Sequence, residues 1–217
     1  FTGVVTVSVK LLPGNHASQP TSTKRPVLSS RVNWFSSTAD LGASPWTNVQ
    51  GVSTYVNNKI IPAATTLIHG RRFQYSQVAG VERTISAWVK AGEVGVHCEL
   101  WTYQARGAVI NLSTWEVTSV DNCTVSLGEF DSEGYRRVWY TSTDSSTGTN
   151  NTDFRVTRST LRDQQFVGDG VSGYYLKNPQ LEYGPVPTRF QSVTTATSYD
   201  TEGFPLYLKG DGIDDFM

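Results

Sequence analysis

The chain has 217 residues, of which 38% are hydrophobic, 12% are aromatic and only 17% are charged. This length suits one β-sandwich with extensions or at most two small domains, and the apolar content is enough to build a core. The formal net charge of −1 gives no electrostatic case for binding nucleic acid or an anionic membrane. No apolar run approaches the roughly 20 residues of a membrane helix, and no signal-peptide pattern is present.

Short alternating segments separated by turn residues run along most of the chain. Val4–Val9 predicts a first strand, and the polar, proline-containing stretch 14–30 predicts a linker or extended arm. Residues 144–152 are expected to form a polar loop, and no amphipathic helix or internal repeat is found. Regular short strands at this spacing favour an antiparallel sandwich or barrel. The expected strands are Ser53–Val56, Thr66–Ile68, Arg72–Gln77, Arg83–Lys90, Gly95–Tyr103, Val109–Leu112, Glu116–Val120, Thr124–Leu127, Arg136–Thr143, Asp153–Arg158 and Gly173–Tyr183.

The most informative segment is 173–190, which reads GYYLKNPQLEYGPVPTRF. Its polar and apolar residues alternate as in a half-buried strand, and it contains the polar pair Gln180-x-Glu182. Gly184 and Pro185 then predict that the chain leaves the sheet. This segment resembles the closing strand of the jelly-roll modules of bacteriophage tail-fibre and other virion proteins. The same jelly-roll family includes carbohydrate-binding modules attached to glycosidases.

Other segments extend the resemblance over about residues 31–190. The stretches ISAWVKAG (85–92) and GYRRVWY (134–140) are similar to two central strands of the family. The stretches GNHASQ (14–19) and KRPVL (24–28) resemble the segment that precedes the module. NWFSST (33–38) and PWT (45–47) resemble its opening, with Trp34-Phe35 where two leucines are common. LYLKGDGIDD (206–215) is similar to the beginning of a laminin-G or concanavalin-like lectin domain.

We therefore expect an all-β fold with one antiparallel jelly-roll β-sandwich at 31–190. An N-terminal strand and linker, 1–30, would precede it. A C-terminal strand segment, 191–217, would lead towards a lectin-like domain beyond Met217. The chain starts without Met and ends inside a motif, so we expect it to be a piece of a longer polypeptide.

The resemblance implies a non-enzymatic structural module of a phage virion, in a fibre, a spike or a head or tail decoration. It implies contacts with other virion proteins and a homo-oligomer, with a trimer as the expected state. Contacts with host-surface glycans are a further expectation. The protein would be made in the bacterial cytoplasm and act in the virion. No cofactor is expected, although modules of this kind often hold a structural calcium ion for which no ligands can be assigned here.

The chain contains no catalytic signature of a hydrolase elbow, a zinc protease or a phosphate loop. His16 and His69 read as linker and turn residues. The acidic run Glu129, Asp131 and Glu133 is favoured as a solvated turn over a pair of catalytic carboxylates. Cys98 and Cys123 lie in different expected strands, and two buried free thiols are favoured over a disulfide, because a phage protein folds in a reducing cytosol.

Side-chain phase suggests one candidate site. In a strand alternate residues share a face, so the aromatic and charged residues of four strands fall opposite the apolar sets. If these faces coincide, flat rings bordered by hydrogen-bonding groups would suit a sugar. The candidate carbohydrate-binding residues are Trp88, Trp101, Tyr103, Trp139, Tyr175, His97, Glu99 and Arg137, with Lys177 beside them.

Other interpretations of the same residues remain open. Packing within the sandwich or against another subunit is favoured over sugar binding, because Trp and Tyr are common in cores and enriched at interfaces. A dedicated carbohydrate-binding module is the first alternative. A fragment of a glycan-cleaving tailspike is the second, and it requires two carboxylates about 5–10 Å apart in one cleft.

Overall fold

A computed structural model describes residues 27–30, 32–102, 106–195, 197–199 and 206–209. The chain divides into two compact units, one made of 1–30 with 205–217 and one of 31–204. In the first unit β1 (Val27–Ser30) pairs antiparallel with β16 (Leu206–Lys209). The last four residues of the expected linker therefore form a strand. The expected strand Val4–Val9 lies outside the described residues.

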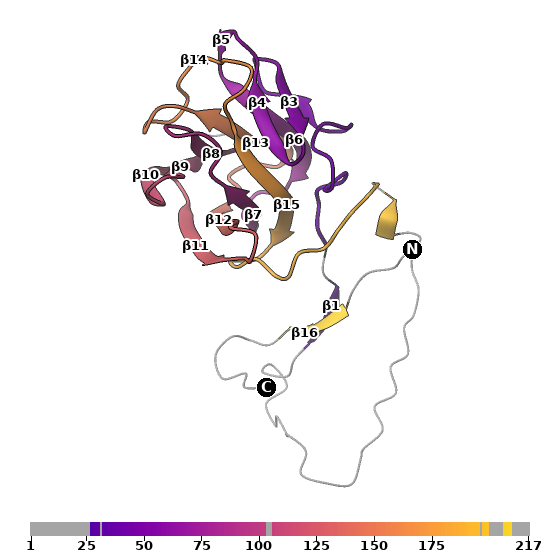
Figure 1. Cartoon of the computed structure of the whole chain (residues 1–217). Coiled ribbons are helices and arrows are strands. Elements are labelled where there is room, and N and C mark those ends of the chain that lie inside the picture. Colours follow the sequence, from indigo (N-terminus) through magenta and orange to yellow (C-terminus); the bar gives the residue numbers. More distant parts are fainter. Residues whose placement is uncertain (1–26, 31, 103–105, 196, 200–205, 210–217) are drawn as a thin grey trace. The chain divides into compact units, whose positions relative to one another are not determined.

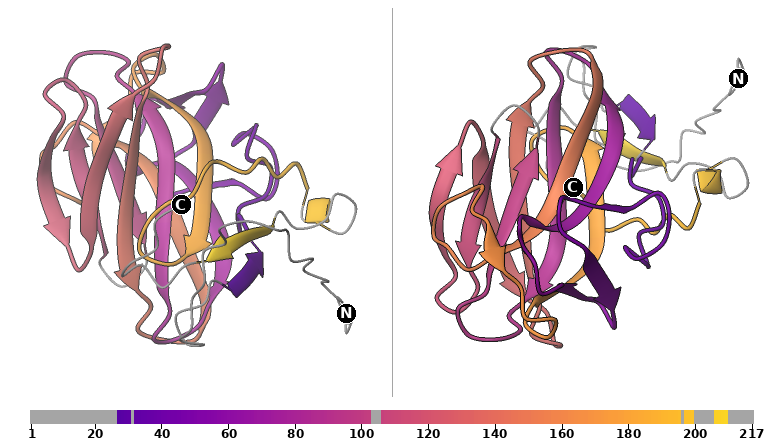
Figure 2. Two further views of the ribbon diagram at one scale, coloured as in Figure 1. Left: turned by 90° about the horizontal axis from the view of Figure 1, so that it is seen from below. Right: turned by 90° about the horizontal axis from the view of Figure 1, so that it is seen from above.

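The second unit is built from two six-stranded antiparallel sheets, which lie face to face (Figures 1 and 2). Sheet I has the strand order β10-β9-β8-β13-β6-β2, and sheet II has the order β11-β12-β7-β15-β4-β3. A small third sheet pairs β5 (Thr66–Leu67) with β14 (Phe166–Val167). The strands of sheet I are β2 (Thr47–Asn48), β6 (His69–Gln77), β8 (His97–Thr102), β9 (Arg106–Asn111), β10 (Glu116–Asp121) and β13 (Gly148–Thr157). Those of sheet II are β3 (Ser53–Val56), β4 (Lys59–Pro62), β7 (Glu82–Lys90), β11 (Thr124–Phe130), β12 (Arg136–Thr143) and β15 (Tyr174–Tyr183).

The structure confirms the predicted fold class, an all-β antiparallel β-sandwich. The main departure is β13, which begins at Gly148, within the stretch expected to be a loop. Its residue Asn150 is opposite Tyr75 in β6 and is buried, so pairing with a long neighbouring strand outweighs the polar composition. The hairpin from β3 to β4 was not predicted. It turns at Asn57 and Asn58, which both have a positive φ, as a two-residue hairpin loop requires.

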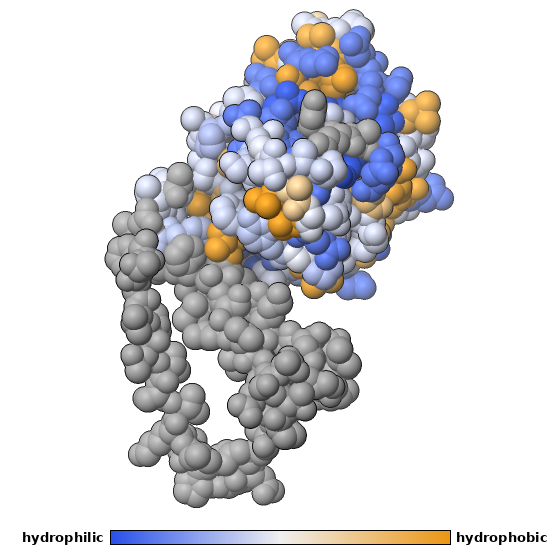
Figure 3. All heavy atoms as spheres, turned by 180° about the vertical axis from the view of Figure 1, so that it is seen from behind, coloured by the Kyte–Doolittle hydropathy of each residue, from blue (hydrophilic) through white to orange (hydrophobic). Residues whose placement is uncertain are grey.

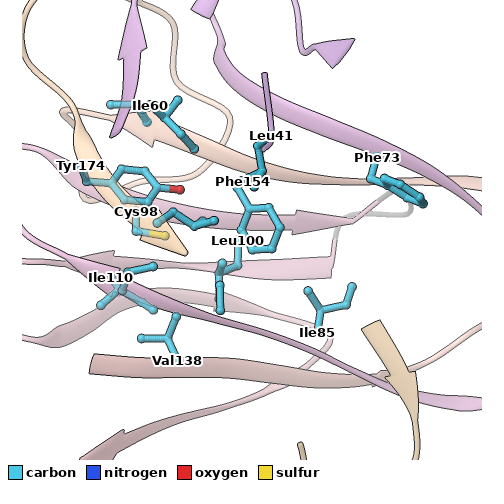
Figure 4. Packing of buried hydrophobic residues seen from close by; sticks show 14 of the residues in the cluster. Leu41, Ile60, Phe73, Ile85, Cys98, Leu100, Ile110, Val138, Phe154 and Tyr174 are labelled. Carbon is cyan, nitrogen blue, oxygen red and sulfur yellow. The ribbon is translucent and has the colours of Figure 1, made fainter. Parts of the chain in front are cut away.

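The core lies between sheets I and II and is dominated by side chains of alternate strand residues (Figure 4). Four aromatic rings cluster in it, with centroids 5.0–6.1 Å apart: Phe35, Trp46, Phe73 and Phe154. The expected opening motif supplies two of them. Phe35 is completely buried, whereas its neighbour Trp34 is 44% exposed and contacts Tyr183 edge to face.

The segment after β15 belongs to the sandwich unit and does not begin a separate C-terminal segment at residue 191. Asn33, which is buried, donates from Nδ2 to the carbonyls of Pro179 and Gln191 and accepts from the amide of Leu181. The amide of Thr38 donates to the carbonyl of Val193. These bonds tie the chain beyond β15 back onto the opening segment.

Both cysteines are free thiols, in agreement with the favoured interpretation. Cys98 lies in the core of the sandwich, and its burial raises the pKa of the thiol to about 12. Cys123 is half-buried, and its burial also raises the pKa of the thiol. A protonated thiol is a poor nucleophile, so the raised pKa values disfavour the reactive thiolate form of both cysteines at neutral pH.

Candidate functional site

The structure divides the candidate sugar-binding residues between two sheets. His97, Glu99 and Trp101 lie in β8 of sheet I, whereas the candidates on β7, β12 and β15 lie in sheet II. Since the core separates the sheets, the outer faces of the two sheets are on opposite sides of the sandwich. The candidates therefore do not share one surface. The candidate residues on sheet II are Trp88, Arg137, Trp139, Tyr175 and Lys177. The remaining candidate, Tyr103, lies outside the described residues.

His97 and Glu99 are covered by the loop that follows β13. His97 is 7% exposed, and its Nδ1 lies 2.9 Å from the carbonyl oxygen of Ser159. Glu99 is 1% exposed, and its Oε1 accepts a hydrogen bond from the amide of Asp163. These two side chains hold a loop on the outer face of sheet I, and neither is accessible to a sugar.

A buried ionic network surrounds them and was missed by the sequence analysis. Arg155 in β13 contacts Glu99 at 3.3 Å, Asp153 at 2.8 Å and Asp163 at 2.5 Å. Its guanidinium also lies 4.0 Å from the ring centre of Trp101, which is therefore covered by a cation. The signal was present, because Asp153 and Arg155 alternate with the apolar Phe154 and Val156.

The buried carboxyl of Glu99 gives the first testable prediction. Burial raises the pKa of Glu99, while the charge of Arg155 opposes the rise. When the pH rises above about 4.3, the carboxyl of Glu99 ionises in the unfolded chain but stays protonated in the folded protein. This difference stabilises the unfolded state relative to the folded state until the pH also exceeds the folded pKa. We expect the free energy of unfolding of the wild type to decrease, relative to that of Glu99→Gln, between about pH 4 and the folded pKa. Urea titrations of both proteins across this range measure the difference, and a difference that does not change with pH contradicts the prediction.

On sheet II two tryptophans lie side by side on the outer face. Trp88 in β7 is directly opposite Arg137 in β12 and Lys177 in β15. Trp139 is opposite Ser86, two residues along β7 from Trp88, so the two indoles are diagonal neighbours. Both indoles are half-buried. We refer to Trp88, Arg137, Trp139 and Lys177 as the indole face.

The chain that leaves β15 borders the indole face on one side. Gln180 accepts from the amide of Gln191, and Glu182 accepts from the amide of Thr188. Both side chains are buried beneath this segment, with exposed fractions of 2% and 5%. The Gln-x-Glu step of the closing strand is therefore structural: its amide and carboxylate satisfy backbone donors of the exit segment.

On its other side the indole face ends at Lys177, which also belongs to an ionic and aromatic cluster. Lys177 contacts Asp131 at 2.9 Å and Glu133 at 2.6 Å, and it lies 4.0 Å from the ring centre of Tyr135. Asp131 also accepts from the amides of Glu133 and Tyr135, so it closes the turn before β12. Asp131 and Glu133 therefore belong to the expected turn, whereas Glu129 is a residue of β11 (Thr124–Phe130). Tyr175 lies beside this cluster, with the ammonium groups of Lys59 and Lys90 at 5.6 Å and 5.9 Å from its ring centre.

The indole face offers flat apolar rings with cationic donors between them. Arg137 donates from Nη2 to Ser86 at 3.0 Å, so the residue opposite Trp88 is bonded to the residue opposite Trp139. Burial lowers the pKa of Arg137 and the nearby Glu182 opposes the shift, but a guanidinium remains charged in proteins. This combination suits the C–H face of a sugar ring or an aromatic and acidic protein surface.

On the side drawn in Figure 3, hydrophobic residues occur in small groups scattered among hydrophilic ones. The described residues contain no group of three or more His, Cys, Asp or Glu side chains that could hold a metal ion. Asp211, Asp214 and Asp215 lie outside them. Within the same residues no helix is long and apolar enough to cross a membrane.

Comparisons with known proteins do not assign a family to this chain. No family model matches it, and no curated protein matches it.

Proposed function

We propose that this chain is a non-catalytic structural module of a bacteriophage virion, with a sandwich of the jelly-roll type, and that the indole face is its contact surface. The resemblance of residues 31–190 to virion modules supports the first part. The partner is another virion protein, and the protein acts within the particle as part of a fibre, a spike or a decoration.

One observation carries the choice of surface. The outer face of sheet II is covered by the exit segment on one side and occupied by the ion pairs of Lys177 on the other, and the two indoles between them are only partly buried. A pair of partly buried tryptophans with an arginine on the neighbouring strand has the composition of an interface centre. Trp101 on sheet I is also only partly buried, but the guanidinium of Arg155 already lies over its ring.

The test replaces the indoles in the phage or prophage that encodes the chain. We expect Trp88→Ala and Trp139→Ala to lower the amount of this protein in purified particles at least about 10-fold, because central tryptophans dominate interface energies. Trp34→Ala is the matched control, since Trp34 is an exposed tryptophan outside the indole face. Quantitative mass spectrometry measures incorporation, and urea unfolding of each purified variant verifies the fold. Normal incorporation of both folded variants would contradict the assembly role.

A carbohydrate-binding module is the second candidate, favoured by the position of Trp88 between the cationic Arg137 and Lys177. A ring stacked on Trp88 would place its hydroxyl groups within reach of both donors. A glycan array probed with the wild type and the three tryptophan variants distinguishes the two functions. Binding that Trp88→Ala loses and Trp34→Ala keeps supports this candidate, and the absence of wild-type binding removes it.

A further inference from the structure

One end of the core between the sheets is polar, and two arginines extend into it. Arg83 in β7 has the same strand phase as the core residue Ile85, and Arg106 in β9 has the same phase as the core residue Ala108. Their exposed fractions are 2% and 8%. Arginines are rarely buried to this extent unless an anion or several hydrogen bonds compensate the charge.

Arg83 is held firmly, but one of its nitrogens has no partner. Its Nε donates to the carboxylate of Asp144, and its Nη2 donates to the carbonyl of Ser76 at 3.1 Å. The rings of Tyr75 and Tyr183 lie on the guanidinium, with centroids 5.0 Å and 4.8 Å from its Cζ. The remaining nitrogen, Nη1, is buried and makes no hydrogen bond within the described part of the chain.

Arg106 presents a second orphaned donor at the same end. Its Nη1 is also buried and makes no hydrogen bond to any described residue. Arg106 is opposite Thr102 in β8, and Thr102 is opposite Thr152 in β13, two residues from the Asn150 that contacts Tyr75. Arg106 therefore lies at the same end of the inner face of sheet I as Tyr75, whose ring contacts Arg83. The charges of both arginines lower the pKa of Asp144, against the effect of its burial. Two guanidinium groups and one carboxylate leave one positive charge uncompensated. Leaving a buried charge unpaired strongly destabilises a fold.

Tyr75 supplies a third donor. Its hydroxyl oxygen accepts from Nδ2 of Asn150 at 3.2 Å, and Asn150 is fixed in turn by Gln77 at 2.5 Å. The hydroxyl proton of Tyr75 is therefore directed away from Asn150 and can be donated. Burial raises the pKa of Tyr75, so the proton stays on the oxygen at neutral pH.

We propose that this polar end of the core binds a small monovalent anion of about the size of chloride, held by Nη1 of Arg83, Nη1 of Arg106 and the hydroxyl of Tyr75. The anion compensates the excess charge and accepts from the orphaned donors at once. A water molecule would accept hydrogen bonds from the orphaned donors but would leave the excess positive charge uncompensated. A multivalent anion would reverse the sign of the buried charge and need space for several oxygens.

Thermal unfolding of the whole chain tests the site, with chloride exchanged for the bulkier isethionate at constant ionic strength. We expect the Tm to rise with chloride concentration by at least about 3 °C, because a ligand bound only to the folded state stabilises it. Arg106→Gln should lose this dependence. Arg158→Gln is the matched control and should keep it, because Arg158 is an exposed arginine paired with Asp169.

A measurement on the unaltered protein keeps the proposal testable if Arg106→Gln does not fold. Crystals grown in bromide are expected to show an anomalous peak within hydrogen-bond distance of Nη1 of both Arg83 and Arg106. The proposal would be overturned by a Tm that is the same in chloride and in isethionate. It would also be overturned if crystals grown in bromide showed only water between the two arginines.

Discussion

Replacement of Arg155 by alanine is expected to lower the free energy of unfolding by about 3–5 kcal/mol. Arg155 is the shared cation of Glu99, Asp153 and Asp163, and the first two of these carboxylates are almost completely buried. Removing it leaves two negative charges in a poorly solvated position with little compensation, although Arg72 still pairs with Asp153. The loss also exposes the ring of Trp101, on which the guanidinium lies.

The matched control is Arg158→Ala, which removes an arginine just after the same strand. Arg158 and Asp169 form an ion pair in which both side chains are more than 40% exposed. Exposed pairs contribute about 0–1 kcal/mol, so this variant should unfold almost as the wild type does. Urea unfolding followed by tryptophan fluorescence measures both. If the two variants lose the same stability, the network around Arg155 is not the buried anchor that its geometry indicates.

Phe154→Ala is expected to be equally severe, with a loss of about 3–5 kcal/mol. Phe154 in β13 is completely buried in the core (Figure 4). Its ring centre lies 6.1 Å from that of Phe35 and 6.0 Å from that of Trp46. The truncation leaves a cavity between the two sheets. Both sheets are rigid and contribute walls to it, so the site cannot collapse fully around the smaller side chain.

Phe130→Ala provides the comparison for a phenylalanine outside the core. Phe130 is 52% exposed, contacts Trp115 edge to face and lies at the end of an edge strand. We expect a loss well below that of Phe154→Ala, of about 1 kcal/mol. Equal losses for the two phenylalanines, at unchanged m-values, would show that the core is not centred where Figure 4 places it.

The sequence by itself determined the fold class and most of the strands. Alternation of period two is a local property, so β7, β12 and β15 could be located and their core-facing residues identified without knowledge of their partners. Ile85, Cys98 and Leu100 have the strand phase opposite to that of the candidate residues, and each is buried between the sheets, as alternation predicts. The hairpin at Asn57 and the start of β13 were missed, because composition is a weak guide where a neighbouring strand supplies the hydrogen bonds.

Only the tertiary structure decided which faces meet. Phase shows on which side of its own strand a residue lies, but it does not show to which sheet the strand belongs, and so Trp88 and Trp101 were grouped although they lie on opposite sides of the sandwich. The same limit hid the environment of the charged residues. Arg83 and Arg155 look alike in the sequence as strand arginines. Their burial against Asp144 and Glu99 depends on residues 61 and 56 positions away in the sequence, and long-range contacts of this kind leave no local pattern.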